Sequence, residues 1–287
     1  MKRFSFYLAA LLLVALYSCN DSKNKTRYLP ESTGGINSLM VVMDTELWQG
    51  AVGDKVREIF AAQVLGLPQP EPIFSITQIP PQVFKGAVTH SRSVLFVEQD
   101  SLSLAHVKTD VYAKPQKVAV VKGETFNDFS DNLDKIAAQA VATFKQVEIK
   151  EAQKRFLRSL SKETAFVEEL GITLKVPSLY KVGKQEKNFV WMDIQIPIGT
   201  MNLLAYAMPE DTFSADSTFV RDIIRMRDSI GEKYIPGPDV PGKKTFMITE
   251  KAFAPYVFPT EIGGKKAAEA RGGWEISGYP MAGPFVT

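Results

Sequence analysis

Few side chains in this chain of 287 residues carry reactive groups: there is one cysteine, Cys19, and there are two histidines, His90 and His106. One cysteine excludes a disulfide within the chain, and one Cys with two His leaves too few ligands for a zinc site. The triplet Thr89-His90-Ser91 does not indicate a base beside a nucleophile, since adjacent residues do not normally face each other, and the G-x-S-x-G motif is absent. We therefore expect no metal, no cofactor and no catalytic residue, and both histidines on loops or at the surface.

Carboxylates are the other group able to do chemistry. Hydrolysis of glycans needs two carboxyls some 5–10 Å apart, and the candidates are Glu168-Glu169, Asp193, Glu210-Asp211 and Glu261. With 32 acids in the chain, chance neighbours are common, and spacing along the chain does not give separation in space. A carboxylate-based hydrolase therefore stays an alternative hypothesis.

Aromatic and arginine side chains are the third candidate set, since tryptophan faces and guanidinium groups together line grooves for glycans or peptides. Of these we select Trp48, Arg271 and Trp274 as candidate ligand contacts. The competing interpretation makes the tryptophans core residues. It also predicts that the helix with the remaining arginines turns a charged face to water, because acidic residues alternate with the arginines. These residues are Arg221, Asp222, Arg225, Arg227 and Asp228.

Nucleotide and nucleic-acid binding are both disfavoured. The segment 237–243 fits G-x-x-x-x-G-K, but Lys244 replaces the required Ser or Thr, and Pro238 and Pro241 remove amide donors. The chain has 34 basic and 32 acidic residues. Removal of Lys2 and Arg3 with a leader leaves 32 of each, a neutral chain without the basic excess typical of nucleic-acid binders.

The N-terminus carries the most specific signal. Lys2 and Arg3 precede a nearly apolar run, 4–16, which is short for a membrane span and typical of a signal peptide. The quartet Leu-Tyr-Ser-Cys at 16–19 resembles the bacterial lipobox. The resemblance implies cleavage after residue 18 and lipidation of Cys19; a plain signal peptide with an incidental cysteine, or an uncleaved anchor, is the alternative.

Residues 19–35 are polar, contain Pro30 and a Gly pair and have no periodicity, which predicts a flexible tether. The residue after Cys19 is Asn20 and not the aspartate that retains lipoproteins in the inner membrane. The resemblance therefore favours attachment to the outer membrane, with the protein facing the periplasm. Asp21 alone is too little acid to indicate export to the surface, which stays open.

The rest of the chain predicts an α+β fold with antiparallel or mixed sheets packed by helices. Apolar runs predict strands at 39–43, 93–97 and 117–121, and Thr125 with Asp128 predicts a capping box before a long helix, 125–160. Alternation predicts a strand at 190–196 paired with 202–208. We expect a short helix at Lys265–Ala270, with Arg271 at its C-terminus, and a strand that begins at Trp274 and buries its ring.

Two organisations are consistent with this order of elements. Either an N-terminal half, 36–160, and a C-terminal half, 161–287, are two similar α+β domains, or the chain forms one α+β domain with a mixed sheet.

Short motifs in the last third resemble a predicted-lipoprotein family of unknown function from Bacteroidetes: Ile235-Pro236-Gly237-Pro238, Phe246–Glu250, Arg271–Glu275 and Met281–Val286. Leu47-Trp48 and the segment 67–72 fit its N-terminal part. The chain departs from that family at Gly273 and Ala282, and members continue past the position of Thr287, so we expect a C-terminally truncated sequence.

The resemblance implies an envelope lipoprotein and assigns no activity. We therefore expect a lipid-anchored cell-envelope protein, attached to the membrane at Cys19, that acts as a non-catalytic binding or structural module for a glycan or protein partner. A carboxylate-based hydrolase of envelope glycans is the alternative. Ligand, partner and oligomeric state do not follow from the residues.

Overall fold

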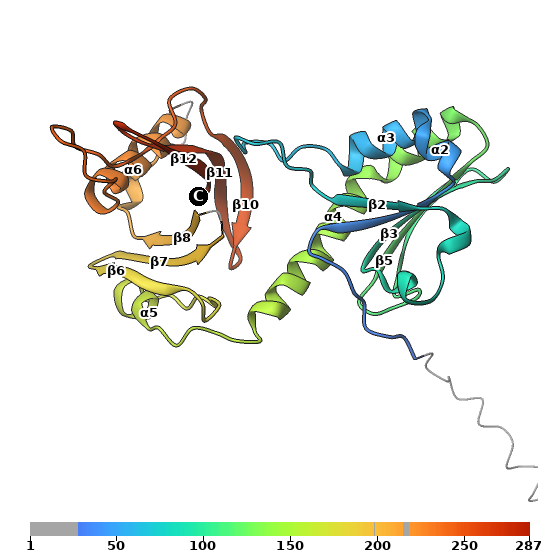
Figure 1. Cartoon of the computed structure of the whole chain (residues 1–287), viewed down its shortest axis with the longest axis horizontal. Coiled ribbons are helices and arrows are strands. Elements are labelled where there is room, and N and C mark those ends of the chain that lie inside the picture. The colour runs from blue at the N-terminus through green and yellow to red at the C-terminus, as the bar shows by residue number, and fades with distance from the viewer. Residues whose placement is uncertain (1–27, 198, 215–217) are drawn as a thin grey trace, which may run out of the picture.

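The computed structural model describes residues 28–197, 199–214 and 218–287, so the signal segment and Cys19 lie outside the described residues. Within these ranges five α-helices and twelve strands form two sheet-rich halves (Figure 1). The predicted α+β class is confirmed. No helix of the described ranges is long and apolar enough to cross a membrane.

The first half contains a five-stranded sheet with order β2-β1-β3-β5-β4, in which β4 alone runs antiparallel to its neighbour. Its elements are β1 (Ser38–Met43), α2 (Thr45–Gln49), α3 (Ala51–Phe60), β2 (Ser75–Ile79), the 3-10 turns η1 (Pro81–Val83) and η2 (Gly86–His90), β3 (Ser93–Gln99), β4 (Leu104–Thr109), β5 (Lys117–Gly123) and α4 (Phe126–Phe156).

The two faces of this sheet are covered differently. Alternate strand residues such as Val41 and Leu95 pack with Phe60 of α3 and Phe144 of α4 into the main core. The opposite face carries Val42, Val94 and Val118 and is covered by the loop containing η1, whose Phe84 contacts Phe96 and Tyr112. The period of two along each strand therefore sends one set of side chains to the helices and the other to a loop.

Helix α4 links the halves. Thr125 accepts from the backbone of Asp128, and the Asp128 carboxylate accepts from the backbone N–H of Thr125, so the predicted capping box is confirmed. At 31 residues and about 1.5 Å per residue, the helix is long enough to extend beyond the first half toward the second (Figure 1).

The second half contains two antiparallel sheets: β6-β7-β8, and β10-β11-β12 with β9 on β11. Its elements are α5 (Ala165–Leu170), β6 (Lys181–Glu186), β7 (Phe189–Ile196), β8 (Gly199–Tyr206), η3 (Glu210–Thr212), α6 (Phe219–Tyr234), β9 (Met247–Thr249), β10 (Tyr256–Ile262), β11 (Lys265–Ile276) and β12 (Tyr279–Val286). The two halves are both sheet-rich, but their strand orders differ.

Helix α6 packs against both sheets of the second half. Met226 and Ile230 contact Phe189 of β7, whereas Ile223 contacts Ala270 of β11 and Phe285 of β12. The residues of α6 that face the sheets are buried, whereas Arg221, Arg225 and Glu232 are exposed to water.

The flexible tether was predicted to extend to residue 35, but the last residues of that range are hydrogen-bonded to the first half. The Pro30 carbonyl accepts from the Lys114 N–H at 2.8 Å, and the Thr33 N–H donates to the His90 carbonyl at 2.8 Å. The Arg92 guanidinium donates to the carbonyl of Gly35 at 2.8 Å. Residues 30–35 are therefore hydrogen-bonded to the first half and not free.

The predicted helix at Lys265–Ala270 is wrong, because these residues form the first half of β11. They pair in antiparallel register with β10, from Tyr256 opposite Arg271 to Ile262 opposite Lys265. The intrinsic helix preference of Lys and Ala is worth only about a few tenths of a kcal/mol per residue. The strand pairing with β10 outweighs this preference. Arg271 is consequently a strand residue and not the end of a helix.

Candidate functional site

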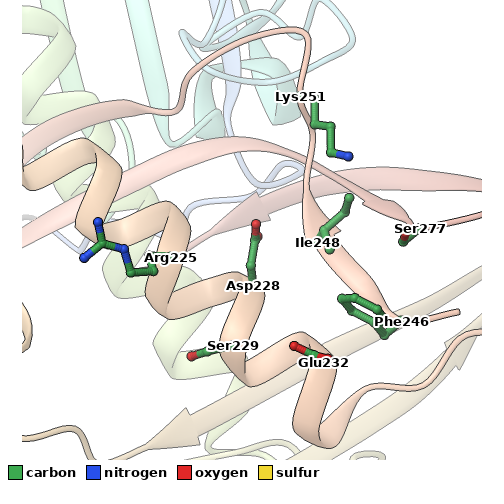
Figure 2. Close-up of a pocket in the computed structure, with 8 residues that line it drawn as sticks. All are labelled: Arg225, Asp228, Ser229, Glu232, Phe246, Ile248, Lys251 and Ser277. Atoms are coloured by element: carbon green, nitrogen blue, oxygen red, sulfur yellow. The ribbon is translucent and has the colours of Figure 1, made fainter. Parts of the chain in front are cut away.

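An open groove lies between α6 and the strand pair β9–β11. Its wall on α6 is formed by Arg225, Asp228, Ser229 and Glu232, and the opposite wall by Phe246, Ile248, Lys251 and Ser277. The helix wall follows from spacing, since positions 225, 228, 229 and 232 are three or four residues apart and share one face. Figure 2 shows Phe246, Ile248 and Lys251 on the strand side, opposite Asp228 and Glu232 of α6, with Arg225 farther along the helix.

The acids of this groove are engaged by the fold. Asp228 Oδ1 accepts from the backbone N–H of Thr249 at 2.7 Å, which satisfies the outer edge of β9. The Glu232 carboxylate pairs with Lys244 Nζ at 2.6 Å. Both carboxylates therefore have partners within the fold.

The cations of the groove are less engaged. Arg225 lies 3.7 Å from Asp222 and its side chain is 70% exposed. In the described part of the chain, Lys251 makes no ion pair or hydrogen bond with its ammonium group. The groove thus offers two available cations beside an apolar surface.

A second hollow lies at the carboxyl ends of β1, β2 and β3. It is lined by Asp44, Thr45, Glu46, Leu47, Pro80, Gln82 and Gln99. The described residues contain no group of three or more His, Cys, Asp or Glu that could hold a metal ion.

The three candidate ligand contacts chosen from the sequence are not brought together. Trp48 is partly buried against the main core, with the Arg57 guanidinium 4.3 Å from its ring centroid. Trp274 is partly buried against Ile223 and Phe285. None of the three lines either hollow.

Arg271 lies where the two halves meet. Its guanidinium bonds the Glu269 carboxylate at 2.5 Å and lies 4.8 Å from the centre of the Phe258 ring. Gly66, in the loop after α3, approaches it so closely that a Cβ at Gly66 would lie 2.7 Å from the Arg271 Cβ. The geometry makes Arg271 a contact between halves.

Of the candidate acids whose side chains the structure describes, Glu168 and Glu169 alone share a hydrogen-bond donor. Gln185 Nε2 donates to Glu168 at 2.9 Å and to Glu169 at 3.1 Å. The hydrogen bonds from Thr164 and Gln185 hold the pKa of the exposed Glu168 below its usual value, opposite to the shift that a general acid needs. Asp193 lies in β7 and Glu261 in β10, whereas the side chain of Glu210 is outside what the structure describes.

The two histidines differ from each other. His90 ends η2, in a loop, as expected. His106 lies inside β4, opposite Val120 of β5, and its Nε2 is buried without a partner in the described residues. Burial lowers the pKa of His106, and Lys108 and Lys122 lower it further. The expectation of a loop position is wrong for His106, which is half-buried in an edge strand.

The prediction that the arginine-bearing helix presents a solvated face is wrong for two residues. Asp222 and Arg227 are each only 6% exposed. Arg227 lies with its guanidinium 3.3 Å from the Phe285 ring centre and donates to Thr287 Oγ1 at 2.6 Å. Burial lowers the pKa of Arg227 to about 10. Alternating charge at helical spacing did not reveal that α6 has sheets on two sides.

The comparisons with known proteins identify families without an assigned activity. Residues 32–157 match a family described as a domain of unknown function (DUF8532), and residues 159–287 match a second domain of unknown function (DUF4837). No curated protein and no solved structure matches the chain.

Proposed function

We propose that this protein is a lipid-anchored component of the cell envelope, held at the outer membrane through Cys19 and facing the periplasm, where it binds an anionic partner without catalysis. The lipobox-like quartet at 16–19 supports the anchor. Several acyl chains on one residue, each adding about 0.8 kcal/mol per buried CH₂, would hold the protein stably at a bilayer.

The docked segment 30–35 limits how far the protein reaches from that anchor. Only residues 20–29 separate Cys19 from the first hydrogen-bonded residue, Pro30. A chain of that length spans at most about 35 Å when fully extended. The first half therefore stays near the membrane.

The groove between α6 and β9 supports the binding role. The observation that carries the proposal is the difference between the acids and the cations that line this groove. Its acids, Asp228 and Glu232, serve the fold, whereas its cations, Arg225 and Lys251, are available. Phe246 and Ile248 add an apolar surface on the strand side of the groove. Such a groove suits a carboxylate or phosphate group on an envelope glycan or peptide, because charge attraction and apolar contact act together.

Co-sedimentation with isolated peptidoglycan sacculi tests this role, because sacculi are insoluble and carry free carboxylates. The mature chain with Cys19→Ser, which removes the acylation site, is expected to sediment with sacculi. The bound fraction should fall as salt rises from about 50 to about 300 mM, since an exposed charge contact is screened. The double variant Arg225→Glu/Lys251→Glu should bind at least fivefold less.

The matched control is Lys135→Glu/Lys150→Glu, which reverses two exposed lysines of α4 and leaves the groove intact. It should bind as the parent does. Equal binding by the groove variant and the control would remove the groove from the function, and no sedimentation of the parent at any salt would overturn the choice of partner.

A further inference from the structure

The hollow at the carboxyl ends of β1, β2 and β3 exists because neighbouring strands send their loops to opposite faces of the sheet. After β1 the chain enters α2, whose Leu47 and Trp48 pack on the helix-covered face. After β2 it enters η1, and the following Phe84 packs on the other face. Divergent loops beside adjacent parallel strands leave a crevice, and in open α/β sheets ligands bind in such crevices.

The polar groups at this crevice are not used by the fold. Asp44 occupies the N-cap position of α2, yet its side chain makes no capping hydrogen bond. Across the described residues, the carboxylates of Asp44 and Glu46 and the amide of Gln82 have no hydrogen-bond or ion-pair partner. Gln99 makes only one long contact, 3.4 Å from its amide nitrogen to the Glu124 carbonyl.

The lining excludes several classes of ligand. It contains two carboxylates and no Lys, Arg or His, so it would repel phosphate, nucleotides and acidic glycans. The turn after β1 reads Met43-Asp44-Thr45-Glu46 and has no glycine that would let a phosphate approach the backbone. Two carboxylates without a third ligand also fall short of a cage for a divalent cation.

Among the ligands that remain, a neutral molecule rich in hydroxyl groups matches the whole polar lining, whereas an amine would match the two carboxylates alone. Carboxylates accept hydrogen bonds from hydroxyls, the amides of Gln82 and Gln99 both donate and accept, and the Thr45 hydroxyl does the same. Leu47 and Pro80 supply apolar surface for the C–H face of a ring. The hollow, at ≈ 520 Å³, falls within the usual range for small-ligand sites.

We propose that this crevice is a binding site for a neutral sugar unit, with Asp44 and Gln99 as its main hydrogen-bonding residues. The site is separate from the groove between α6 and β9, so it does not depend on the anionic partner proposed for that groove.

Isothermal titration of the mature chain carrying Cys19→Ser with maltotriose and with chitotriose tests the site. At least one neutral trisaccharide should give saturable binding below about 10 mM, with an affinity that does not change with salt. Asp44→Ala should weaken binding at least tenfold, and Gln99→Ala should act in the same direction. Asp44 does not cap α2, so the melting temperature of Asp44→Ala should match that of the parent.

The matched control is Asp131→Ala, which removes an exposed carboxylate from α4 and should leave binding unchanged. Absence of saturable binding for both trisaccharides overturns the proposal, as does unchanged affinity in Asp44→Ala. Tighter binding of glucosamine, lost at high salt, would also overturn it by making the crevice a site for cations.

Discussion

The side chains of Arg92, which directly precedes β3, and of Glu148 in α4 form an ion pair at 3.0 Å in which both are almost completely buried, at 1% and 2% exposed. Glu148 also accepts from the Ser93 hydroxyl and from the Asn37 N–H. Arg92 also donates to the Gly34 and Gly35 carbonyls. One charged pair thus ties the start of β3, the long helix and the docked N-terminal segment together.

Removing either partner of this pair should be strongly destabilising. Arg92→Ala leaves the Glu148 carboxylate buried without its cation, which typically costs about 3–5 kcal/mol. Urea denaturation measures this loss, and Lys154→Ala, which breaks an exposed pair with Glu31, should not shift the midpoint measurably. The apolar double variant Arg92→Met/Glu148→Leu should lose less than Arg92→Ala alone; a larger loss would show that the hydrogen bonds, and not the isolated charge, dominate.

Gly66 should be needed for the contact between the halves. Its φ is +87°, and a Cβ there would lie 2.7 Å from the Cβ and 2.9 Å from the carbonyl oxygen of Arg271. Gly66→Ala should therefore separate the halves and raise the radius of gyration measured by small-angle scattering. Gly86→Ala is the control, since Gly86 has φ +63° with nothing within 4 Å and carries only the backbone strain of about 1–2 kcal/mol. Identical scattering from both variants would contradict a contact role for Gly66.

Trp274 should contribute to stability more than to binding. Its ring packs against Ile223, Phe285 and the backbone of Gly283, where a Cβ would lie 2.9 Å from the indole Cζ2. Trp274→Ala is expected to cost about 3 kcal/mol, the low end for large aromatic residues, because the ring is only partly buried. Gly283→Ala should also destabilise by pushing the ring aside. Thermal unfolding measures both, and a Trp274→Ala variant that melts with the parent would return this residue to the candidate ligand contacts.

Stability should depend on pH through His106. Burial lowers the pKa of His106 in the folded protein, whereas the unfolded chain titrates near its usual value of about 6.5. The unfolded state therefore binds the proton first, so this contribution to stability is complete above about pH 6.5 and is lost as pH falls through the folded pKa. His106→Leu should flatten the loss in free energy of unfolding between about pH 7 and pH 5, while His90→Leu should not. A parent profile without slope in that window would show that the folded pKa is not lowered.

The sequence predicted those elements whose signals are local. The capping box of Thr125 and Asp128 and the apolar period after it located α4 closely, because cap and stripe are set within a few neighbouring residues. The alternation at 190–196 likewise located β7. The strand at 265–276 was missed at its start because its pairing with β10 is a tertiary contact that the residues Lys265–Ala270 do not encode locally.

The buried charges were not predictable for the same reason. Arg92 and Glu148 are 56 positions apart, and neither stands in a motif. Arg227 resembles its exposed neighbour Arg225 in the sequence, and only the position of α6 between two sheets buries it. The groove lining combines residues 225–232 with residues 246–277, which the topology of β9 and β11 brings together. Asp44 reads in the sequence as a helix cap, and only the structure shows that its side chain does not cap α2.

Lipidation of Cys19 is the central proposal for this protein, because it determines where both proposed binding surfaces would operate. Metabolic labelling with a radioactive fatty acid, applied to cells expressing the parent and Cys19→Ala, measures it most directly. The parent should carry label and fractionate with outer membranes, and Cys19→Ala should carry none and be released from membranes. Equal labelling of the two proteins, or an unlabelled parent, would contradict the anchor.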